Sequence, residues 1–429
     1  MPTLGAIADD FTGATDLATM LVARGYRTVV TVGPDGITDS RSGAAVRDAD
    51  ALVVALKSRT APVGEAVADS LASLRALRDA GCRRFYFKYC STFDSTPHGN
   101  IGPVADALLA ELGERRSVVV PSFPATGRTV RDALLSVHGE LLEDSPMRHH
   151  PLTPMRDSHV GRLLAPQTGH PVRLVGLDTV RAGVAALKAA LDEPESADAL
   201  VVVDAVTDDD LRTVSAAAED LALVTGAAGL ALGLTGPRPD ADAARATPAS
   251  ALGAPGVVLS GSASSATRAQ VAHGRTRLPH HKLDLVALRA DFTGSVDALV
   301  AFARACWQDD PQRPPLIYAV DDLRDLQQAA PPGAEPAAEL VERTLAACAA
   351  RLVDAGARRL LVAGGETSGA VVTALGVRTL SIGAPIAPGV AWARAEGRVH
   401  DRDHAVDLAL KSGNFGDTTI FTEAWSVLV

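Results

Sequence analysis

Short apolar runs alternate with helical patterns along most of this chain. The segments between the runs place apolar residues on one helical face, as at Ala14–Arg24, where Leu17 and Leu21 share a side. The runs themselves predict buried strands at Leu4–Ala8, Thr28–Val32, Ala51–Leu56, Arg84–Lys88, Val118–Val120, Val172–Val175, Leu200–Val203 and Leu221–Thr225. Regular alternation of strands and helices predicts an α/β fold with largely parallel sheets covered by helices.

The alternation is interrupted over residues 233–255, which are rich in Pro, Gly, Asp and Ala. We therefore expect two α/β domains, residues 1–235 and 256–429, joined by a linker over residues 236–255. In open α/β sheets, ligands bind beyond the carboxyl ends of the strands. The polar residues that follow each strand are the candidates for chemistry, and we expect the active site in the cleft between the domains.

Composition narrows the class of protein. The net charge of -10 argues against nucleic acid, whose binding needs a basic surface. No apolar run reaches the roughly 18 residues of a membrane span, and the N-terminus shows no secretory pattern. The four cysteines are isolated, without metal-binding spacing. We expect a reduced, cytoplasmic protein without a membrane or nucleic-acid partner.

Two strand ends in the first half carry charge. Asp9 and Asp10 follow the first strand, before a helix expected to be capped by Thr12, and could bind substrate hydroxyls, a cation or a proton. The alternative is that one carboxylate caps the helix and the other is solvated. Lys57 and Arg59 follow the third strand and suit a small carboxylate or phosphate, although a solvated turn has the same composition.

A hydroxyl-rich loop follows the fourth strand. The strand ends at Lys88, and the loop carries Ser91, Thr92 and Asp94, which offer short donors and acceptors to a polyhydroxylated substrate. Arg128 stands beside a glycine turn after the next strand. Hydroxyl-rich loops are common, so these residues alone leave their role open.

Glycine-rich turns mark the second half. A strand at Leu360–Ala363 leads through Gly364–Gly369 into a helix expected at Ala370–Leu375. Unpaired N–H groups and the positive helix dipole favour an anion there, although an ordinary βα turn uses glycine for geometry too. No lysine follows at Walker A spacing. The turns at Ser260–Ser265 and Lys411–Gly416 are similar, and three such turns in one domain predict a nucleotide's phosphates.

Lysine is scarce, which gives the remaining lysines weight. Of 41 Lys and Arg residues only five are lysine, and Lys57, Lys88 and Lys411 fall in these segments. A compact ammonium suits phosphate and carboxylate oxygens.

Together these segments resemble the four-carbon acid sugar kinase family over nearly the whole chain. The resemblance rests on IADDFTGATDLA (7–18), KYCSTFDSTPHGNIGPV (88–104), PSFPATGRTV (121–130), HHPLTPM (149–155), VLSGSASSATRAQV (258–271), GGETSGAV (364–371) and LKSGNFG (410–416). The branch it resembles most phosphorylates the terminal hydroxyl of a four-carbon keto-acid sugar, 3-oxo-tetronate, with ATP. Departures at Pro385, Ala391 and Ala227–Ala228 put the fine geometry of the site in question.

The resemblance implies an N-terminal domain that binds the acid sugar and a C-terminal domain that binds ATP, with Mg²⁺ bridging the phosphates. It implies the ATP-binding residues Ser260, Ser262, Gly364, Gly365, Glu366, Thr367 and Gly413. Our hypothesis for the substrate site is Lys57, Arg59, Lys88, Ser91, Thr92 and Arg128, with Asp10 as general base ahead of Asp9 or Asp94. No protein ligand to a metal is assigned.

Three other interpretations stay open. A threonate or erythronate kinase would share every motif, and a non-catalytic acid-sugar binding protein would share the substrate site. A nicotinamide-linked dehydrogenase is disfavoured because no GxGxxG follows a strand. A homo-oligomer is compatible with the sequence.

Overall fold

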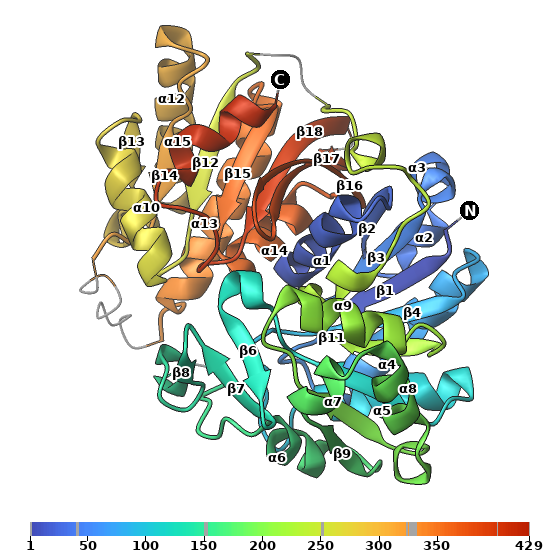
Figure 1. Ribbon diagram of the computed structural model, residues 1–429. Helices are drawn as coiled ribbons and strands as arrows, with labels where there is room; N and C mark the ends of the chain where they lie inside the picture. Colours follow the sequence, from blue (N-terminus) through green and yellow to red (C-terminus); the bar gives the residue numbers. More distant parts are fainter. Residues whose placement is uncertain are drawn as a thin grey trace. The chain divides into compact units, whose positions relative to one another are not determined.

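The computed structural model describes residues 2–39, 43–149, 153–249, 253–322, 325, 333–400 and 402–428. Within this part, the chain forms two compact units, Met1–Ala244 and Arg245–Val429 (Figure 1). Residues 150–152 of the HHPLTPM motif and 250–252 of the expected linker lie outside the described residues.

The first unit is built on eight parallel strands. They run in the order β2-β3-β1-β4-β11-β5-β10-β9. Their bounds are β1 (Leu4–Ala8), β2 (Thr28–Val32), β3 (Ala51–Ala55), β4 (Arg84–Lys88), β5 (Ser117–Val120), β9 (Val172–Val175), β10 (Leu200–Val203) and β11 (Leu223–Gly226). Every strand predicted for the first half is confirmed, with ends that differ by at most two residues.

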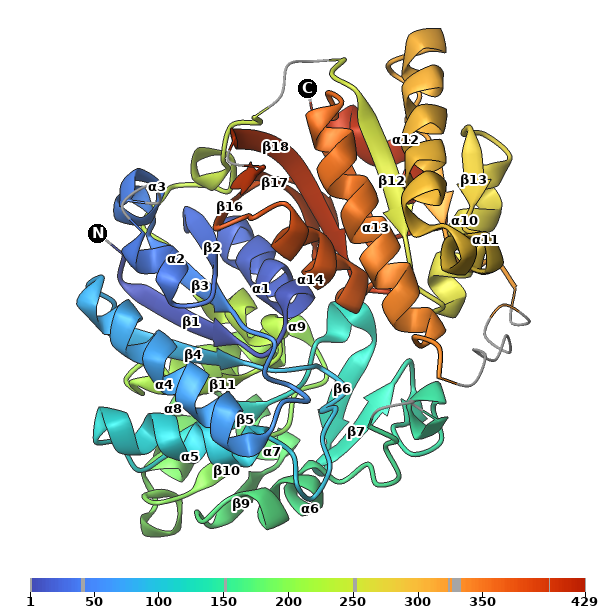
Figure 2. The same ribbon diagram turned by 180° about the vertical axis from the view of Figure 1, so that it is seen from behind.

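Helices cover both faces of this sheet (Figures 1 and 2). α1 (Phe11–Ala23) and α9 (Asp208–Ala217) lie on one face, and α4 (Val63–Asp79) and α5 (Ile101–Leu112) on the other. Each inserts at least one buried leucine, and a fully buried leucine contributes about 1.5–3 kcal/mol. The shorter helices are α2 (Asp35–Thr38), α3 (Gly43–Asp48), α6 (Val160–Leu164), α7 (Leu177–Arg181) and α8 (Val184–Asp192).

A small antiparallel sheet in the first unit was not predicted from the pattern. It consists of β6 (Arg128–Arg131), β7 (Leu134–Val137) and β8 (Glu140–Leu141), in that order. These strands are too short for a clear alternation of apolar and polar positions. The buried carboxylate of Asp204 fixes the tight turn between β6 and β7, because it accepts the amide N–H groups of Asp132 at 2.6 Å and Ala133 at 2.9 Å.

The second unit has a mixed sheet in the order β13-β14-β12-β15-β18-β17-β16. Its first five strands are parallel, whereas β17 runs antiparallel to both β18 and β16. The predicted largely parallel sheet is therefore confirmed, with β16 and β17 as the antiparallel part. The bounds are β12 (Gly256–Ser260), β13 (His280–Lys282), β14 (Leu316–Tyr318), β15 (Arg359–Ala363), β16 (Thr379–Ala387), β17 (Val390–Val399) and β18 (Arg402–Lys411).

The helices of the second unit also lie on both faces (Figures 1 and 2). One face carries α12 (Phe292–Asp309), α13 (Ala337–Asp354) and α14 (Gly365–Ala374), and the other carries α10 (Ser265–Arg275) and α15 (Ile420–Glu423), while α11 (Leu285–Ala290) precedes α12. The start predicted for α14 at Ala370 was wrong, because the glycine turn is itself the first turn of the helix. Gly, Thr and Ser are weak helix formers, so the apolar pattern marks the helix too late.

The described part of the expected linker is held by hydrogen bonds and an ion pair. The amide of Gly236 donates to the carbonyl of Arg24 at 2.8 Å, and the guanidinium of Arg238 pairs with Asp50 at 2.7 Å. Further along, the amide of Ala246 donates to the carbonyl of Ile382 at 2.7 Å. The start of the segment is thus bound to the first unit and its later part to the second. Within the described ranges, no helix has both the length and the apolar character that crossing a membrane requires.

Candidate functional site

The polar site of the first unit lies where three neighbouring strands end. β1 pairs in parallel with both β3 and β4, so Ala8 lies beside Ala55 and Lys88. The residues that follow these strands therefore meet at one edge of the sheet, as expected for an α/β ligand site. This register explains why the residues that the sequence analysis assigned to one site lie near one another. They are Asp9, Asp10, Arg59 and Lys88.

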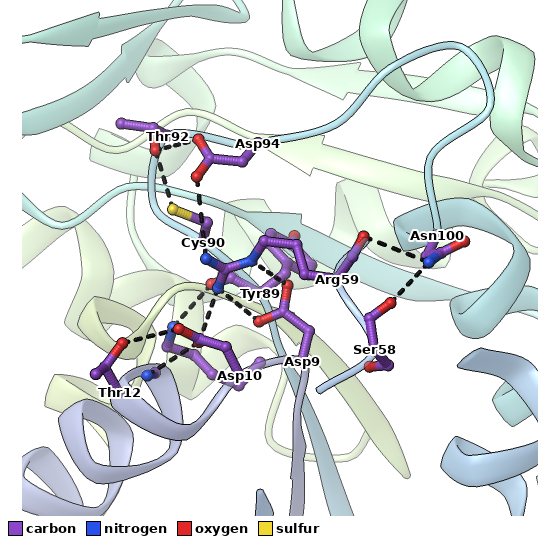
Figure 3. Close-up of polar contacts among 12 residues, drawn as sticks. Asp9, Asp10, Thr12, Ser58, Arg59, Tyr89, Cys90, Thr92, Asp94 and Asn100 are labelled. Carbon is purple, nitrogen blue, oxygen red and sulfur yellow. Dashed lines mark hydrogen bonds and ion pairs between the residues drawn. The ribbon is translucent and has the colours of Figure 1, made fainter. Parts of the chain in front are cut away.

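Arg59 is the centre of an ion-pair network (Figure 3). Its Nε and Nη2 donate to the two carboxylate oxygens of Asp9 at 2.9 and 2.8 Å, and Nη2 also donates to Oδ1 of Asp10 at 2.7 Å. Nη1 lies 4.0 Å from Oδ2 of Asp94. One guanidinium thus pairs with two carboxylates and lies near a third, while 23% of its side chain stays exposed.

Asp10 has a second role as the N-cap of α1. Its Oδ1 accepts the amide N–H of Gly13 at 3.0 Å, and its Oδ2 accepts the hydroxyl of Thr12 at 2.8 Å. The expectation that Thr12 caps this helix was wrong, because Thr12 lies inside its first turn. Capping does not remove Asp10 from the charged site, since the same carboxylate contacts Arg59 and is 24% exposed.

The environment separates the two adjacent carboxyl groups electrostatically. Burial raises the pKa of Asp9, and the charge of Arg59 offsets this only in part. Burial acts in the same direction on Asp10, but the charges of Arg59 and Lys88 and the hydrogen bonds from Thr12 and Gly13 outweigh it, so the pKa of Asp10 is lowered. Two neighbouring acids whose pKa values are pushed apart are suited to different roles in proton transfer.

Lys88 lies buried above the first turn of α1. Its Nζ donates to the carbonyl of Tyr89 at 2.9 Å. A Cβ on Gly13 would lie 3.1 Å from this Nζ and 2.3 Å from Oδ1 of Asp10. Gly13 therefore lets an ammonium and a carboxylate approach the helix start closely, which a larger residue would prevent.

The hydroxyl-rich loop and Arg128 complete this site. The hydroxyl of Thr92 donates to Asp94 at 2.5 Å and contacts the thiol of Cys90 at 2.9 Å. Arg128 is mostly buried; its Nη1 donates to the carbonyl of Thr126, and its Nε has no hydrogen-bond partner among the described residues. Burial lowers the pKa of Arg128 despite the nearby Cys90 and Asp94.

Two of the residues predicted to bind the substrate are more exposed than the ion-pair network around Arg59. Ser91 is half-buried at the start of the loop, and the side chain of Lys57 is exposed. Lys57 and Arg59 thus differ strongly in environment although both follow β3.

Asp16 is a buried carboxylate that the sequence analysis did not select. Asp16 belongs to α1 and is 5% exposed. Its Oδ1 has no hydrogen-bond partner in the described structure. Burial raises its pKa to about 6, although the charge of Lys88 opposes the shift. The available signal was that Asp16 is the one charged residue of α1, whose other side chains are apolar or carry a hydroxyl group.

A small pocket extends the site toward α5. It is lined by Asp9, Ser58, Arg59, Phe87, Asp94, Ser95, Asn100, Ile101 and Val104. The amide nitrogen of Asn100 donates to the carbonyls of Ser58 at 2.7 Å and Ala61 at 2.9 Å (Figure 3 shows the first), which fixes the turn that carries Arg59. Ser95 and Asn100 were not predicted as site residues, because nothing in the sequence tells them from other loop residues.

Three glycine-containing turns converge in the second unit. β12, β15 and β18 are neighbours, so the turns after Ser260, Ala363 and Lys411 lie at the same sheet edge. A Cβ on Gly413 would lie 2.7 Å from Oγ of Ser262, and one on Gly364 would lie 3.3 Å from the amide nitrogen of Ser262. The structure therefore brings the three predicted turns together, and glycine permits their close approach.

Hydroxyl groups tie these turns to one another. A Cβ on Gly261 would lie 2.2 Å from Oγ1 of Thr367, so the first and second turns are in contact. The hydroxyls of Ser264 and Thr267 both donate to the carbonyl of Gly413. Ser264 also caps α10, and neither of these two residues was among the predicted ones.

The remaining predicted residues lie on the same turns. Ser260 is buried at the end of β12, and its hydroxyl has no partner in the described part of the chain. Gly365 and Glu366 are exposed in the first turn of α14. Exposed amide groups at a helix start, beside Ser and Gly turns, can bind phosphate oxygens.

The donor set near these turns bears on how Mg²⁺ could be held. No group of three or more His, Cys, Asp or Glu side chains suited to a metal ion occurs among the described residues. Mg²⁺ commonly keeps several waters and takes its remaining oxygens from substrate phosphates and one or two carboxylates. The hydroxyl-rich turns fit an ion carried in by a nucleotide, and the first turn of α14 adds one exposed acid, Glu366.

Fold and site together define an α/β protein with a charged small-molecule site in one unit and a phosphate-type turn site in the other. Comparison with protein families matches residues 4–234 to a sugar-binding N-terminal domain and residues 257–421 to a nucleotide-binding C-terminal domain. The chain belongs to the four-carbon acid sugar kinase family.

Curated relatives match over the full length. The chain is 48% identical to a 3-oxo-tetronate kinase of Burkholderia multivorans, covering 100% of this chain and 97% of the relative. It is also 48% identical to a 3-oxo-tetronate kinase of Pseudomonas fluorescens, covering 99% and 96%.

Two solved structures share the fold. A Salmonella typhimurium LT2 protein, which carries the provisional description of a tRNA synthase, has a TM-score of 0.85 at 41% identity, covering 99% of both chains. A Haemophilus influenzae protein has a TM-score of 0.76 at 38% identity, covering 99% of this chain and 100% of its own.

Proposed function

We propose that this protein is an ATP-dependent kinase that phosphorylates the terminal 4-hydroxyl of 3-oxo-tetronate. The observation that carries the proposal is the full-length match, at 48% identity, to relatives named 3-oxo-tetronate kinase. The two sites support it, since one combines cationic side chains with carboxylates and hydroxyls and the other has glycine- and hydroxyl-rich turns of a kind that can bind phosphate. Ligation of tRNA is disfavoured by the net charge of -10, which would repel a polyanion.

In this proposal, residues 1–235 bind the acid sugar, residues 256–429 bind the nucleotide and residues 236–255 connect them. Arg59, Lys88 and Arg128 hold the substrate carboxylate and keto oxygen, because charge-assisted hydrogen bonds to carboxylates are strong. The unsatisfied Nε of the buried Arg128 gives it a donor for this purpose. Ser91, Thr92 and Asp94 bind hydroxyl groups, and the exposed Lys57 attracts the anion electrostatically.

Asp10 is the proposed general base, with Asp9 and Asp94 as alternatives. The lowered pKa of Asp10 keeps it ionised at neutral pH, and it is more exposed than Asp9. Oδ1 of Asp10 accepts from Gly13 and Arg59, whereas Oδ2 accepts from Thr12 only among the described residues, so a lone pair of Oδ2 can accept the hydrogen bond of the acceptor hydroxyl.

In the second unit, Ser260, Ser262, Gly364–Thr367 and Gly413 bind the ATP phosphates through hydroxyl and backbone N–H groups. Mg²⁺, carried by the phosphates, would neutralise charge that develops during transfer. Phosphoryl transfer depends mainly on alignment and charge stabilisation. The acceptor hydroxyl held by the first unit must therefore meet the γ-phosphoryl group held by the second.

The test is a coupled assay of ADP release with Mg·ATP and a panel of 3-oxo-tetronate, threonate and erythronate. We expect the highest kcat/KM with 3-oxo-tetronate and a product whose phosphate is on the 4-oxygen by phosphorus NMR. A higher kcat/KM with threonate or erythronate would favour the sister kinases. Binding of the acids without ATP-dependent product would instead indicate a non-catalytic binding protein.

A further inference from the structure

Lys411 is a buried lysine that the roles proposed above leave unused. It ends β18 beside Ala363 of β15, and its side chain is 0% exposed. Its Nζ donates to Oγ1 of Thr267 at 3.1 Å and to the carbonyls of Ser412 at 2.9 Å and Gly413 at 3.0 Å. An ammonium has three donors, so all three are used by uncharged acceptors.

The charge of Lys411 has no carboxylate partner within the described ranges. Of the charged residues on neighbouring elements, Glu366 of α14 is exposed, and Arg268 of α10 donates to the carbonyl of Ala263. On the strands, Asp407 of β18 accepts the amide of Ala249, and Arg394 of β17 lies opposite Asp407 rather than Lys411. Burial lowers the pKa of Lys411 to about 7.

Burying an ammonium without a counter-ion costs free energy, which hydrogen bonds to uncharged acceptors offset only in part. Titratable groups held in such environments cluster at functional sites. The position of Lys411 beneath the three converging turns indicates what that function is. The carbonyl of Gly413 accepts from Lys411, Ser264 and Thr267, which fixes this turn on its inner side.

The inner contacts also determine what the turn presents on its other side. In a trans peptide the C=O and the following N–H point in opposite directions. Because the carbonyls of Ser412 and Gly413 face Lys411, the amides of Gly413 and Asn414 face away from it. No hydrogen bond from either amide to another described residue is formed. Two such N–H groups next to Ser262 and the start of α14 suit a polyanion.

We propose that Lys411 is a positioning residue of the nucleotide site, which orients the Gly413 and Asn414 amides toward a nucleoside polyphosphate and supplies a buried positive charge beneath it. This inference rests on the proposed function, because ATP is the polyphosphate in question. The bound phosphates favour the charged form of the lysine, so a neutral amine takes up one proton from the solvent when the nucleotide binds.

The experiment is titration calorimetry of the full-length protein with Mg·ADP, in buffers of different ionisation enthalpy. At pH 7.5 the phosphates are ionised, since their second pKa is about 6. We expect uptake of roughly 0.5–0.8 proton per ADP at pH 7.5 and roughly 0.1 from this group at pH 6, as a pKa of about 7 requires.

Three variants separate a charge effect from a packing effect. Lys411→Met should bind ADP roughly 10–100-fold more weakly and lose the proton uptake at pH 7.5. Lys411→Arg should bind ADP without proton uptake, because its charge does not titrate. Lys188→Met, at an exposed lysine of the first unit, should match the wild type.

Several outcomes would overturn the inference. Wild-type binding of ADP without proton uptake at pH 7.5 refutes it whether or not the variants fold. The inference is also refuted if Lys411→Met binds ADP weakly but still takes up the wild-type number of protons. ADP binding with no uptake leaves the proposed kinase function intact, whereas no ADP binding by the wild type refutes that function and this inference together.

Discussion

The two sites of this protein solve the problem of binding an anion in different ways. In the first unit, Asp9, Asp10 and Asp94 surround Arg59, so charged side chains are held in a network before any ligand arrives. In the second unit the predicted site consists of glycine backbone and hydroxyl groups, with Lys411 buried beneath them. A small acid sugar offers few atoms, so a site for it needs strong directional charges, whereas a triphosphate can be held by many backbone N–H groups.

The first prediction breaks the charged network. Arg59→Ala leaves three carboxylates near one another without their common partner, and removing one member of a buried ion pair costs about 3–5 kcal/mol. We expect kcat/KM for the acid sugar to fall at least about 10³-fold, while Mg·ADP affinity measured by calorimetry stays within about twofold.

Arg59→Lys is the matched variant, because it keeps the charge and loses the planar fork. We expect partial recovery of acid-sugar binding, since an ammonium cannot contact Asp9 through two parallel bonds. An equal loss of ADP binding in Arg59→Ala would contradict the separation of the two sites.

The second prediction breaks the backbone site. In Gly413→Ala, a methyl group would lie 2.7 Å from Oγ of Ser262 and 3.1 Å from Cβ of Ser264, so the serine side chains that meet this turn have to move. We expect the KM for ATP to rise roughly 10–100-fold, with binding of the acid sugar unchanged in calorimetry, since a displacement of about 1 Å can cost 10²-fold.

Gly64→Ala is the control for this change, because nothing lies within 4 Å of a Cβ at that position in α4. It should leave both KM values unchanged. A similar rise in the KM for ATP in both variants would show that the effect is not steric contact between the turns.

The third prediction concerns Asp16 and pH. Its pKa is about 6 in the folded chain and about 3.9 when unfolded, so the folded state binds more protons between these values. Its contribution to stability is therefore fully present below about pH 4 and is lost as the pH rises through about 6. Asp16→Asn should raise the free energy of unfolding at pH 7 by about 1–3 kcal/mol relative to wild type, and much less at pH 4.

Chemical denaturation at pH 4 and pH 7 measures this difference. Asp48→Asn, at an exposed position in α3, is the control and should show no such pH dependence. A stability gain of Asp16→Asn that is the same at both pH values would mean that the carboxylate does not titrate in this window.

The smallest predicted effect tests a region outside both sites. Thr207 caps α9 in a reciprocal capping box with Asp210. Thr207→Ala should lower the free energy of unfolding by about 1 kcal/mol. Both KM values should remain at the wild-type level in the coupled assay, since neither site contacts this helix start. A changed KM for either substrate would show that the loss of stability at α9 also alters one of the two sites.

Much of the candidate site could be predicted because it follows strand ends. Asp9, Asp10, Arg59 and Lys88 come directly after short apolar runs, and a parallel sheet brings such positions together. Asp16, Asn100 and Lys411 were missed or left without a role for a common reason. Their significance lies in burial and in hydrogen bonds that are present or absent, and neither property is visible in a pattern of residue types.

The sequence by itself determined the order of strands and helices along the chain, because strand and helix periodicities are local properties of side-chain direction. It also determined which turns contain glycine, and so which could approach a phosphate. Only the tertiary structure decided the ion pairs of Arg59 with Asp9 and Asp10, the alignment of β12, β15 and β18 as neighbours, and the burial of Lys411 without a carboxylate partner among the described residues. These features depend on contacts between residues far apart in the chain, whose energies no local pattern encodes.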